Sequence, residues 1–581
     1  MIPSWRRDDP LLSPGFFGPR GFVRRVTLNS DGYALSDTLA LGQPEQQVTT
    51  WVRQAGTNLV TATTDALGRR TAYSYDTSSV MLTTTQLAGT PDAVTTTFTH
   101  EPTFHQPASV TDALGHTWRP QYDSSRRLTG TTDPLGHETT FAMNVAGQIA
   151  SVSDPLSHTW HHGYSAGNLS SLTDASGTVT TRFLAGAGRL LATADPLGRV
   201  TQTTLDKVSQ VTSVTDALGK ETAYTYDANG NLLSLTDALT HTTSYTYDAF
   251  DQIATRTDPL SRTSSYRYDV NQNPTQMTGR KHQIGSRAYD ALDRLSLVMH
   301  DDSSTTAFTY DAADRVTQIV DSVSGTITRT YDGSNRLTSE VTPEGSFAYT
   351  YDADGRRTIM TVAGQPAVAY AYDAAHRLTA ITQATAVVTF AYDEADRRTG
   401  VILPNGITGT YAYDAANRLT GVTYALGATV LGDVTYAYDA AGQRTSVGGT
   451  WARTGLPVPL MSATHDAANQ VLTWDATSFS YDQDGNQVGN GLTTYTWTAR
   501  NQLASMTGAV NGSFAYDGWA GRPRPPVGLD RVVFRGAISS GCVGSWGCAN
   551  CSQNRDVESV PAQSMKTVSS PTVGIRRPRP G

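Results

Sequence analysis

The sequence has almost no cysteine. Of its 581 residues only Cys542, Cys548 and Cys551 are cysteines, so the first 541 residues contain none. Most of the chain is therefore not held together by disulfide bonds. The three thiols follow a C-x5-C-x2-C spacing with no later histidine, which falls short of the four ligands of a structural zinc site. We expect neither a metal nor a cofactor.

Charge and long apolar runs are also scarce. Charged residues make up 17% of the chain, against about 25% in average globular proteins. The net charge is −8 and no large basic block occurs, which argues against nucleic acid as a partner. No stretch approaches the ~18–20 apolar residues of a membrane span. The N-terminal region has arginines but no apolar run of ~7–15 residues, so no signal peptide is recognisable and the export route stays open.

What the sequence does have is a repeat. Tyr-Asp ends at six aspartates spaced 21 residues apart, namely Asp227, Asp248, Asp269, Asp290, Asp311 and Asp332. A second element, Thr-Asp-Ala/Pro-Leu-Gly or a close variant, recurs every 20 or 21 residues with its aspartates at Asp112, Asp133, Asp154, Asp174, Asp195, Asp216, Asp237 and Asp258. The two series are offset by 11 residues. One unit thus contains two half-units, each closed by an Asp-led turn.

Turn chemistry explains the spacing. Asp133-Pro134-Leu135-Gly136 has the residue preferences of a type I turn, in which the aspartate side chain accepts a backbone N–H two residues on. Tyr226-Asp227-Ala228-Asn229-Gly230 fits a bulged hairpin loop. We take as repeat-defining structural residues Tyr226, Asp227, Tyr247, Asp248, Tyr268, Asp269, Tyr331, Asp332, Tyr413, Asp414, Asp133, Gly136, Asp216 and Gly219.

Between the turns we expect strands of roughly six or seven residues. Paired tyrosines two residues apart, such as Tyr224 and Tyr226, lie on one face of a strand and predict aromatic ladders through the array. Leu232 and Leu235 are three apart and have opposite parity. Either both faces are partly covered or a β-bulge intervenes.

The predicted fold class is all-β. Tandem ~21-residue hairpins run from Asp65 to Asp517 and give about forty strands, whereas open twisted sheets rarely exceed about ten without curling. The hairpins must therefore coil into a large curved sheet or a hollow β-shell. We divide the chain into a partly repeat-like lead-in (1–50), the array (51–522) and a divergent tail (523–581), for which disorder is the simpler reading.

No catalytic or metal-binding residue stands out. His116, His137, His158 and His241 follow the Asp turns at equivalent positions, and this recurrence favours loop solubility over a catalytic base. The repeated aspartates would suit Ca²⁺, but the glycine-rich nonapeptide of calcium β-rolls is absent. We expect a protein that is not an enzyme.

Three segments carry a family resemblance: Tyr-Asp-Ala-Asn-Gly-Asn-Leu at 226–232, Tyr-Asp-Gly-Ser-Asn-Arg-Leu at 331–337 and Tyr-Asp-Ala-Ala-Asn-Arg-Leu at 413–419. They resemble the YD repeats of the RHS family, and the resemblance covers about residues 50–522. It implies a hollow β-shell, as in bacterial RHS polymorphic toxins, insecticidal toxin complexes and teneurins. It further implies a secreted or cell-surface location, and a polypeptide cargo or companion shell segment as partner. YD repeats are also associated with carbohydrate binding.

The resemblance is incomplete. The family's shell-closing core, an Asp-Pro-x-Gly-Leu element followed by an Arg-rich segment, has no counterpart, so its self-cleavage aspartates cannot be carried over. The leading hypothesis is a non-enzymatic scaffold, whole or truncated, that encloses or presents a toxin-type polypeptide. A surface adhesin that binds glycans on its tyrosine ladders is the alternative. A toxin with its activity in residues 523–581 is the weaker third option.

Overall fold

Each Asp-led turn is a five-residue hairpin loop that its aspartate holds together. The computed structural model describes residues 15–17, 21–452, 462–508, 511–516 and 523–524. In the turn that begins at Asp133, the Gly136 N–H donates to the Asp133 carbonyl at 3.1 Å, and the Asp133 N–H donates to the His137 carbonyl at 3.0 Å. Asp133 Oδ1 accepts the backbone N–H groups of Leu135 and His137 at 2.9 and 2.8 Å. Gly136 has φ +89°, a value that glycine adopts without strain.

The Tyr-Asp turns have the same construction. Asp227 Oδ1 accepts from the backbone N–H groups of Asn229 and Asn231 at 2.9 and 2.8 Å, and Gly230 has φ +92°. In the central repeats each strand has such a five-residue turn before it and another after it. The strands are accordingly shorter than the six or seven residues expected from the sequence: in the central repeats they alternate between five and six.

A β-bulge in every unit settles the parity of the leucines. Strand β20 pairs with β21 so that Thr225 faces Ser234 and Tyr226 faces Leu232, which leaves Leu233 as the extra residue. Tyr224 faces Leu235 in the same ladder. Both leucines therefore lie on the tyrosine face, and Leu233 is 38% exposed. The bulge, and not cover on both faces, accounts for the three-residue spacing.

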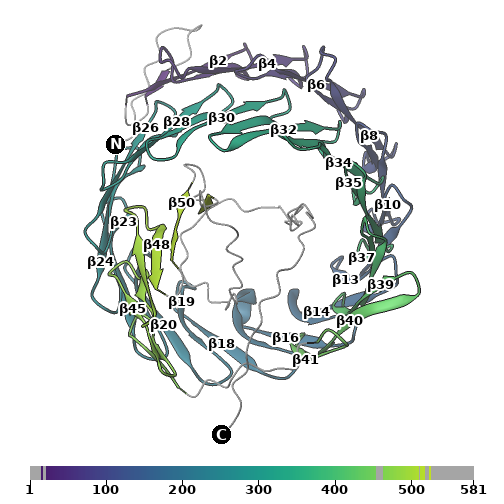
Figure 1. Cartoon of the computed structure of the whole chain (residues 1–581). Coiled ribbons are helices and arrows are strands. Elements are labelled where there is room, and N and C mark those ends of the chain that lie inside the picture. The colour runs from purple at the N-terminus through teal and green to yellow at the C-terminus, as the bar shows by residue number, and fades with distance from the viewer. Residues whose placement is uncertain (1–14, 18–20, 453–461, 509–510, 517–522, 525–581) are drawn as a thin grey trace. The chain divides into compact units, whose positions relative to one another are not determined.

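The first 41 strands of the described residues form one antiparallel sheet in which each strand pairs with the next in sequence (Figure 1). The first part comprises β1 (Gly15–Phe17), β2 (Val23–Leu28), β3 (Ala34–Leu39), β4 (Gln47–Arg53), β5 (Val60–Thr64), β6 (Arg70–Tyr75), β7 (Met81–Gln86), β8 (Val94–His100), β9 (Pro107–Thr111), β10 (Thr117–Tyr122), β11 (Leu128–Thr132), β12 (Glu138–Met143), β13 (Ile149–Ser153), β14 (Thr159–Ser165), β15 (Asn168–Thr173), β16 (Val179–Leu184), β17 (Leu190–Ala194), β18 (Val200–Leu205), β19 (Val211–Thr215), β20 (Glu221–Tyr226), β21 (Leu232–Thr236), β22 (Thr242–Tyr247), β23 (Ile253–Thr257), β24 (Thr263–Tyr268) and β25 (Pro274–Thr278). The short 3-10 segment Gly186–Gly188 lies in the turn after β16.

The sheet continues through β26 (Ile284–Tyr289), β27 (Leu295–Met299), β28 (Thr305–Tyr310), β29 (Val316–Asp321), β30 (Gly325–Tyr331), β31 (Leu337–Thr342), β32 (Gly345–Tyr351), β33 (Arg357–Val362), β34 (Val368–Tyr372), β35 (Leu378–Gln383), β36 (Ala386–Tyr392), β37 (Arg398–Ile402), β38 (Ile407–Tyr413), β39 (Leu419–Leu426), β40 (Thr429–Tyr438) and β41 (Arg444–Gly448). Three small sheets follow: β42 (Ala463–His465), β43 (Val471–Trp474) and β44 (Thr477–Ser478); β45 (Ser480–Tyr481), β46 (Gln487–Gly489), β47 (Thr493–Trp497), β48 (Leu503–Gly508) and β49 (Gly512–Ser513); β50 (Ala515–Tyr516) and β51 (Pro523–Arg524).

The all-β prediction is confirmed, and the long sheet curves instead of closing into a barrel. Among the described strands every ladder joins consecutive strands, so β1 and β41 do not pair with each other. The ladder is continuous from β1, which puts the described part of residues 15–50 in the same sheet as the array. The domain boundaries drawn from the sequence stay predictions, and most of the tail lies outside the described residues.

Tyrosine hydroxyls tie consecutive strands together. The hydroxyl of Tyr226 donates to the Val211 carbonyl at 2.8 Å, and that of Tyr247 donates to the Leu232 carbonyl at 2.8 Å. Three more of the repeat-defining tyrosines make the same bond, Tyr268, Tyr331 and Tyr413, to the carbonyls of Ile253, Val316 and Arg398. The acceptor lies fifteen residues earlier each time. Each bond joins a strand to the strand before it, and it adds to the stability of a sheet that has few fully buried side chains.

Removing one of these bonds should weaken a single junction. In Tyr247→Phe the ring stays and the Leu232 carbonyl loses its donor, so we expect the local opening free energy of β21 and β22 to fall by about 1 kcal/mol. Amide hydrogen exchange measures this directly, because a long repeat array does not unfold in one step. Tyr245→Phe, two residues earlier in β22, is the matched control. Equal losses in both variants would contradict the structural role of the Tyr247 hydroxyl.

Candidate functional site: the seam between two turns of the sheet

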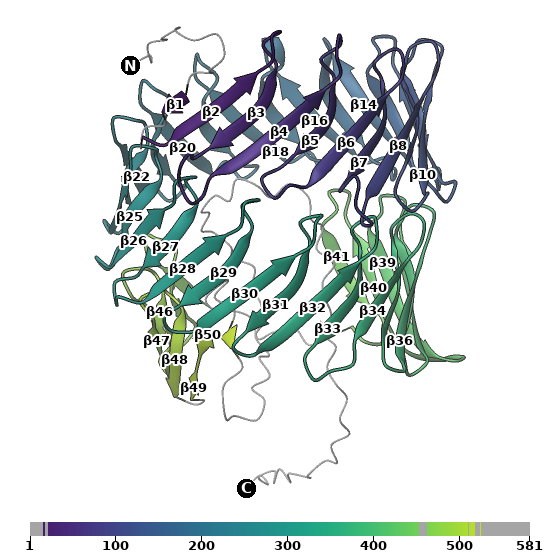
Figure 2. The ribbon, with the colours of Figure 1, turned by 90° about the horizontal axis from the view of Figure 1, so that it is seen from above.

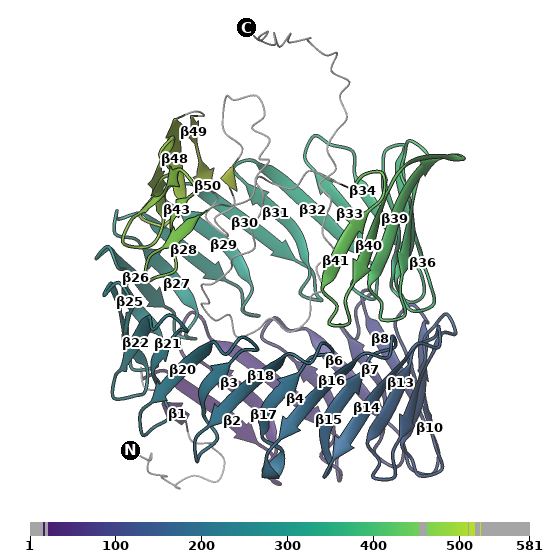
Figure 3. The same cartoon turned by 90° about the horizontal axis from the view of Figure 1, so that it is seen from below.

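Side chains join residues of the sheet that are some two hundred residues apart. Here the Thr-Asp edge denotes the sheet edge with the turns at Asp65, Asp112, Asp133, Asp195 and Asp258, and the Tyr-Asp edge denotes the one with the turns at Asp311, Asp332, Asp352, Asp373 and Asp439. The line where the two edges meet is called the seam. A circuit is the stretch of chain between two residues that meet across the seam, and Figures 2 and 3 show the two circuits lying side by side. Its contacts include Gln47–Asp314, Arg69–Asn335, Asp112–His376, Arg199–Gln443, Arg262–Gln470, Lys281–Asp482 and Asp321–Arg500.

The number of residues in one circuit of the coil falls towards the C-terminal end of the chain. Gln47 and Asp314, which meet at 2.6 Å, are 267 residues apart in sequence, whereas Asp321 and Arg500 are 179 apart. Lys281 and Asp482 are 201 apart. The chain thus forms a coil whose second circuit, completed by the small sheets, contains fewer residues than its first.

In three of the seam contacts the side chain comes from the residue four places after a turn aspartate, namely Arg69, Arg199 and Arg262. Arg69 Nε donates to Asp65 Oδ2 at 2.7 Å, and its NH1 reaches the Gly333 carbonyl at 3.0 Å and Asn335 Oδ1 at 2.5 Å in the opposite edge. The aspartate carboxylate therefore does two things. One oxygen closes the turn, and the other aims a cationic or polar side chain at the neighbouring circuit.

Along the Tyr-Asp edge the same position links one turn to the next. Arg315 Nε donates to Asp311 Oδ2 at 2.7 Å, and its NH1 donates to the Asp332 carbonyl at 3.0 Å. Its guanidinium lies over the Tyr331 ring, 4.7 Å from the centroid. The arginines that repeat this pattern are Arg294, Arg336, Arg356, Arg377, Arg397 and Arg418.

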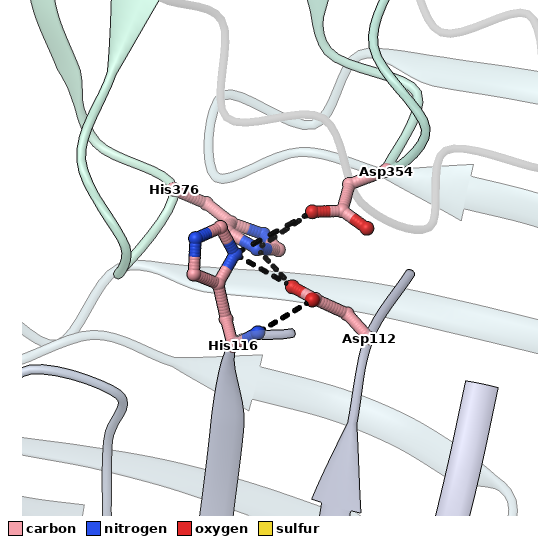
Figure 4. A group of neighbouring side chains, drawn as sticks. All are labelled: Asp112, His116, Asp354 and His376. Carbon is pink, nitrogen blue, oxygen red and sulfur yellow. Dashed lines mark hydrogen bonds and ion pairs between the residues drawn. The ribbon is translucent and has the colours of Figure 1, made fainter. Parts of the chain in front are cut away.

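One seam contact brings two histidines and two aspartates together (Figure 4). His376 Nε2 lies 3.0 Å from Asp112 Oδ2, and His116 Nδ1 lies 2.9 Å from the same oxygen. Asp354 Oδ2 lies 3.6 Å from His116 Nδ1 and 3.5 Å from His376 Nε2. These four residues, the seam cluster, come from the Thr-Asp turn at 112–116 and from the Tyr-Asp turns at 352–356 and 373–377.

The pKa values of the two carboxyls in the seam cluster are shifted in opposite directions. Burial opposes ionisation of Asp112, but hydrogen bonds from His376 and His116 outweigh it and lower the pKa of Asp112 to about 2. Burial raises the pKa of Asp354, and the neighbouring Asp112 raises it further. Chemically the cluster presents two imidazole nitrogens and two carboxylate oxygens to one point, which is a set of ligands suited to a metal ion.

A second convergence lies one unit away on the seam. Asp133, His137 and Asp396 place one ligand atom each within 4.8 Å of one another, and His137 Nδ1 is 2.9 Å from Asp133 Oδ2. Asp396 is exposed and also pairs with Arg377 at 2.9 Å. This group has one imidazole where the seam cluster has two.

The most deeply buried ion pair of the seam is Asp321–Arg500. The Asp321 side chain is fully buried, Arg500 NH1 lies 2.5 Å from its Oδ2, and Thr306 Oγ1 donates to that oxygen at 2.7 Å. Burial alone would raise the pKa of Asp321. The hydrogen bonds from Thr306, Arg500 and the backbone of Ser324 and Val323 outweigh burial and lower the pKa to about 2.

The structure places the repeat-defining aspartates and glycines in turns at the two edges of the sheet. Asp133 and Gly136 lie in a seam turn, and Asp216 and Gly219 form an equivalent turn in which Asp216 Oδ1 accepts from Leu218 and Lys220. The other repeat-defining aspartates, Asp227, Asp248, Asp269, Asp332 and Asp414, cap turns of the Tyr-Asp edge. Cys542, Cys548 and Cys551 lie outside the described residues.

The interpretation of the four histidines as solubilising loop residues is wrong. His116, His137, His158 and His241 are partly buried, and each ring Nδ1 pairs with the turn aspartate four residues earlier at 2.9–3.2 Å. Sequence reasoning missed His376 and Asp354. Both belong to Tyr-Asp turns, where no repeated pattern marks them, and only the length of one circuit brings them opposite Asp112.

Comparisons with known proteins agree with this architecture. RHS repeats match residues 103–138, 144–179, 186–221, 206–242, 226–263, 247–283, 392–429 and 413–450, and the Teneurin YD-shell matches residues 268–406. The chain belongs to the RHS/YD-repeat family. A search among curated proteins finds no match.

Solved structures show the same fold. The chain is similar to the crystal structure of TcdB2-TccC3, with a TM-score of 0.62 and 13% identity over 85% of this chain. It is also similar to TcdB2-TccC3-Cdc42, with a TM-score of 0.55, 13% identity and 84% covered. The chain spans 38% and 31% of the length of those chains. Among the described residues, no helix has the length and hydropathy to cross a membrane.

Breaking the buried ion pair should open the C-terminal part of the seam. Arg500→Met leaves the Asp321 carboxylate buried without its cation, which should cost about 3 kcal/mol in the local opening free energy of β47 and β48. Hydrogen exchange measures this. Arg24→Met is the control, because Arg24 pairs with Asp37 at 2.6 Å but is 54% exposed, and it should cost no more than about 1 kcal/mol. Similar losses in both variants would contradict the importance of burial.

The same pair predicts a dependence on acid. The pKa of Asp321 is lowered on folding, so its contribution is present above the ordinary value near 3.8 and is lost as the pH falls towards about 2. Between pH 5 and 2 the local stability of β47 and β48 should fall by about 2 kcal/mol more in the wild type than in Asp321→Asn. Hydrogen exchange against pH gives both curves. Parallel curves would rule out this role of Asp321.

Proposed function

We propose that this chain is a non-enzymatic wall segment that encloses or presents a polypeptide. The observation that carries the proposal is the seam. Side chains of one circuit bind the edge of the next at several turns along the seam, so the coil forms a wall and not a loose ribbon. A wall of this kind can keep a polypeptide away from proteases, and a companion segment can complete it.

The comparisons support the scaffold part of this proposal. The family is shell-forming, and the similar solved structures are complexes of TcdB2-TccC3. The chain spans about a third of those chains, and its partners are inferred from the family: a polypeptide cargo or a companion shell segment. A secreted or cell-surface location follows from the same family reasoning.

The tyrosine ladders favour the scaffold over the glycan-binding adhesin. A tyrosine that stacks on a sugar needs a free ring face. In the Tyr-Asp edge the ring of Tyr331 is covered by Arg315 and its hydroxyl is bonded to Val316, and Tyr413 is held in the same way by Arg397 and Arg398. These tyrosines are already used in joining units.

Protection from protease tests the proposal. An unfolded reporter polypeptide is appended after Gly581, and the fusion is digested with a nonspecific protease. Enclosure predicts that the reporter is cut at least about tenfold more slowly than the same reporter alone, because cleavage requires the wall to open. The matched control is the fusion carrying Arg69→Ala and Arg500→Met, which weakens the seam at both ends. In that fusion the reporter should be cut faster.

The proposal fails on a clear outcome. If the reporter is cut at the same rate in the intact fusion, in the seam-weakened fusion and alone, the chain does not enclose an attached polypeptide. Strong binding to glycans that is lost in Tyr→Ala variants of one ladder, together with equal cleavage rates, would favour the adhesin instead.

A further inference from the structure

The seam cluster has a feature that hydrogen bonding within the protein does not explain. The Asp354 side chain is only 5% exposed, and its buried Oδ2 accepts no hydrogen bond. The nearest imidazole nitrogens, on His116 and His376, are 3.6 and 3.5 Å away, and the Arg356 guanidinium is 3.8 Å away, which is in each case too far for a good hydrogen bond. A buried carboxylate oxygen without a donor is costly unless something else compensates it. This oxygen points toward the two imidazoles (Figure 4).

We propose that the seam cluster binds one divalent ion of the zinc class, and that this ion joins the two circuits of the sheet. The ligand atoms are Nδ1 of His116, Nε2 of His376, and Oδ2 of Asp112 and of Asp354. Nothing in this proposal depends on what the wall encloses.

The four distances between a nitrogen and an oxygen ligand fit a tetrahedral ion, and all four ligand atoms lie within 4.8 Å of one another. Zinc binds nitrogen and oxygen ligands at about 2.0–2.1 Å, so neighbouring ligands of a regular tetrahedron are about 3.3 Å apart. The four distances from each imidazole nitrogen to each carboxylate oxygen are 2.9, 3.0, 3.5 and 3.6 Å. They bracket the tetrahedral value. A central ion requires the two short contacts to lengthen and the two long ones to shorten by only a few tenths of an ångström.

The surroundings hold the ligands in place. Asp112 Oδ1 accepts the backbone N–H groups of Leu114 and His116 at 3.0 and 2.8 Å, which leaves Oδ2 for the cluster. The His376 ring packs edge to face on Trp118, with centroids 5.1 Å apart. His376 is 34% exposed, which gives an ion a path from solvent, whereas Asp112 and Asp354 are 14% and 5% exposed.

The donor set decides the kind of ion. Calcium and magnesium prefer oxygen ligands only, and two imidazoles disfavour them. Two nitrogens and two oxygens suit zinc and its neighbours among the divalent transition metals. The expectation of no metal, drawn from the sequence, differs from this proposal because Asp112 and His376 are 264 residues apart in the chain.

The test is zinc binding by the full chain, freed of metal with a chelator and carrying no histidine tag. All variants also carry Cys542→Ser, Cys548→Ser and Cys551→Ser, so that tail thiolates do not bind the metal. Titration calorimetry with zinc chloride should give one tight site. In His376→Gln the dissociation constant should rise by more than the 10–100-fold typical of losing an outer-shell partner. His137→Gln, at the turn position equivalent to that of His116 one unit away, should bind as the parent does.

A second readout separates a ligand from a structural residue. In Asp354→Asn a buried carboxylate is replaced by a neutral amide, so the metal-free protein should be as stable as the parent or more so. Zinc should raise the melting temperature of the parent in a concentration-dependent way and leave that of Asp354→Asn unchanged. Zinc should also slow hydrogen exchange in the turns at 112–116, 352–356 and 373–377 of the parent only. Calcium chloride should do none of this.

Three outcomes would overturn the proposal. The first is parent protein that binds no zinc. The second is equal loss of binding in His376→Gln and His137→Gln. The third is Asp354→Asn that destabilises the metal-free protein and still responds to zinc, since Asp354 would then be a structural residue of the seam.

Discussion

The carboxylate of the turn aspartate is the interaction on which the rest of the structure depends. In the turn at Asp332, Oδ1 accepts the backbone N–H groups of Ser334 and Arg336, and Oδ2 accepts the Arg336 Nε at 2.6 Å. One side chain therefore closes the hairpin, fixes the turn length and orients the next functional group. Because the turns that begin with Asp in the central repeats, such as those at Asp216, Asp227 and Asp237, use five residues, each following strand there starts at the same place in its unit. The regular sheet, the tyrosine ties and the seam all follow from that constancy.

The local architecture could be predicted from the sequence, because each unit repeats its own evidence. The Asp-led turns, the tyrosine pairs and the all-β coil depend on residues at most about 21 apart. Leu232 and Leu235 left two readings open, and the bulge at Leu233 decides between them. Strand length was overestimated since the turns take five residues.

The seam cluster could not be predicted, because its members are brought together by the length of a circuit. That length depends on the twist and curvature accumulated over many strands. A small error per strand, summed along the circuit, moves His376 away from Asp112. The four turn histidines also carried a misleading signal. Their recurrence at one repeat position suggested solvent-exposed loop residues. At that position, however, the imidazole pairs with the carboxylate of the turn aspartate.

The narrowing of the coil from 267 to 179 residues per circuit has a consequence for how such a chain can evolve. A tandem array looks free to gain or lose a unit, since each unit pairs only with its neighbours. Here a single duplicated unit would displace every later side chain relative to the circuit beside it, so the two circuits would no longer be in register. Arg69, Arg262 and Arg500 would then meet unsuitable partners. The contacts between circuits thereby constrain the number of repeats in each circuit.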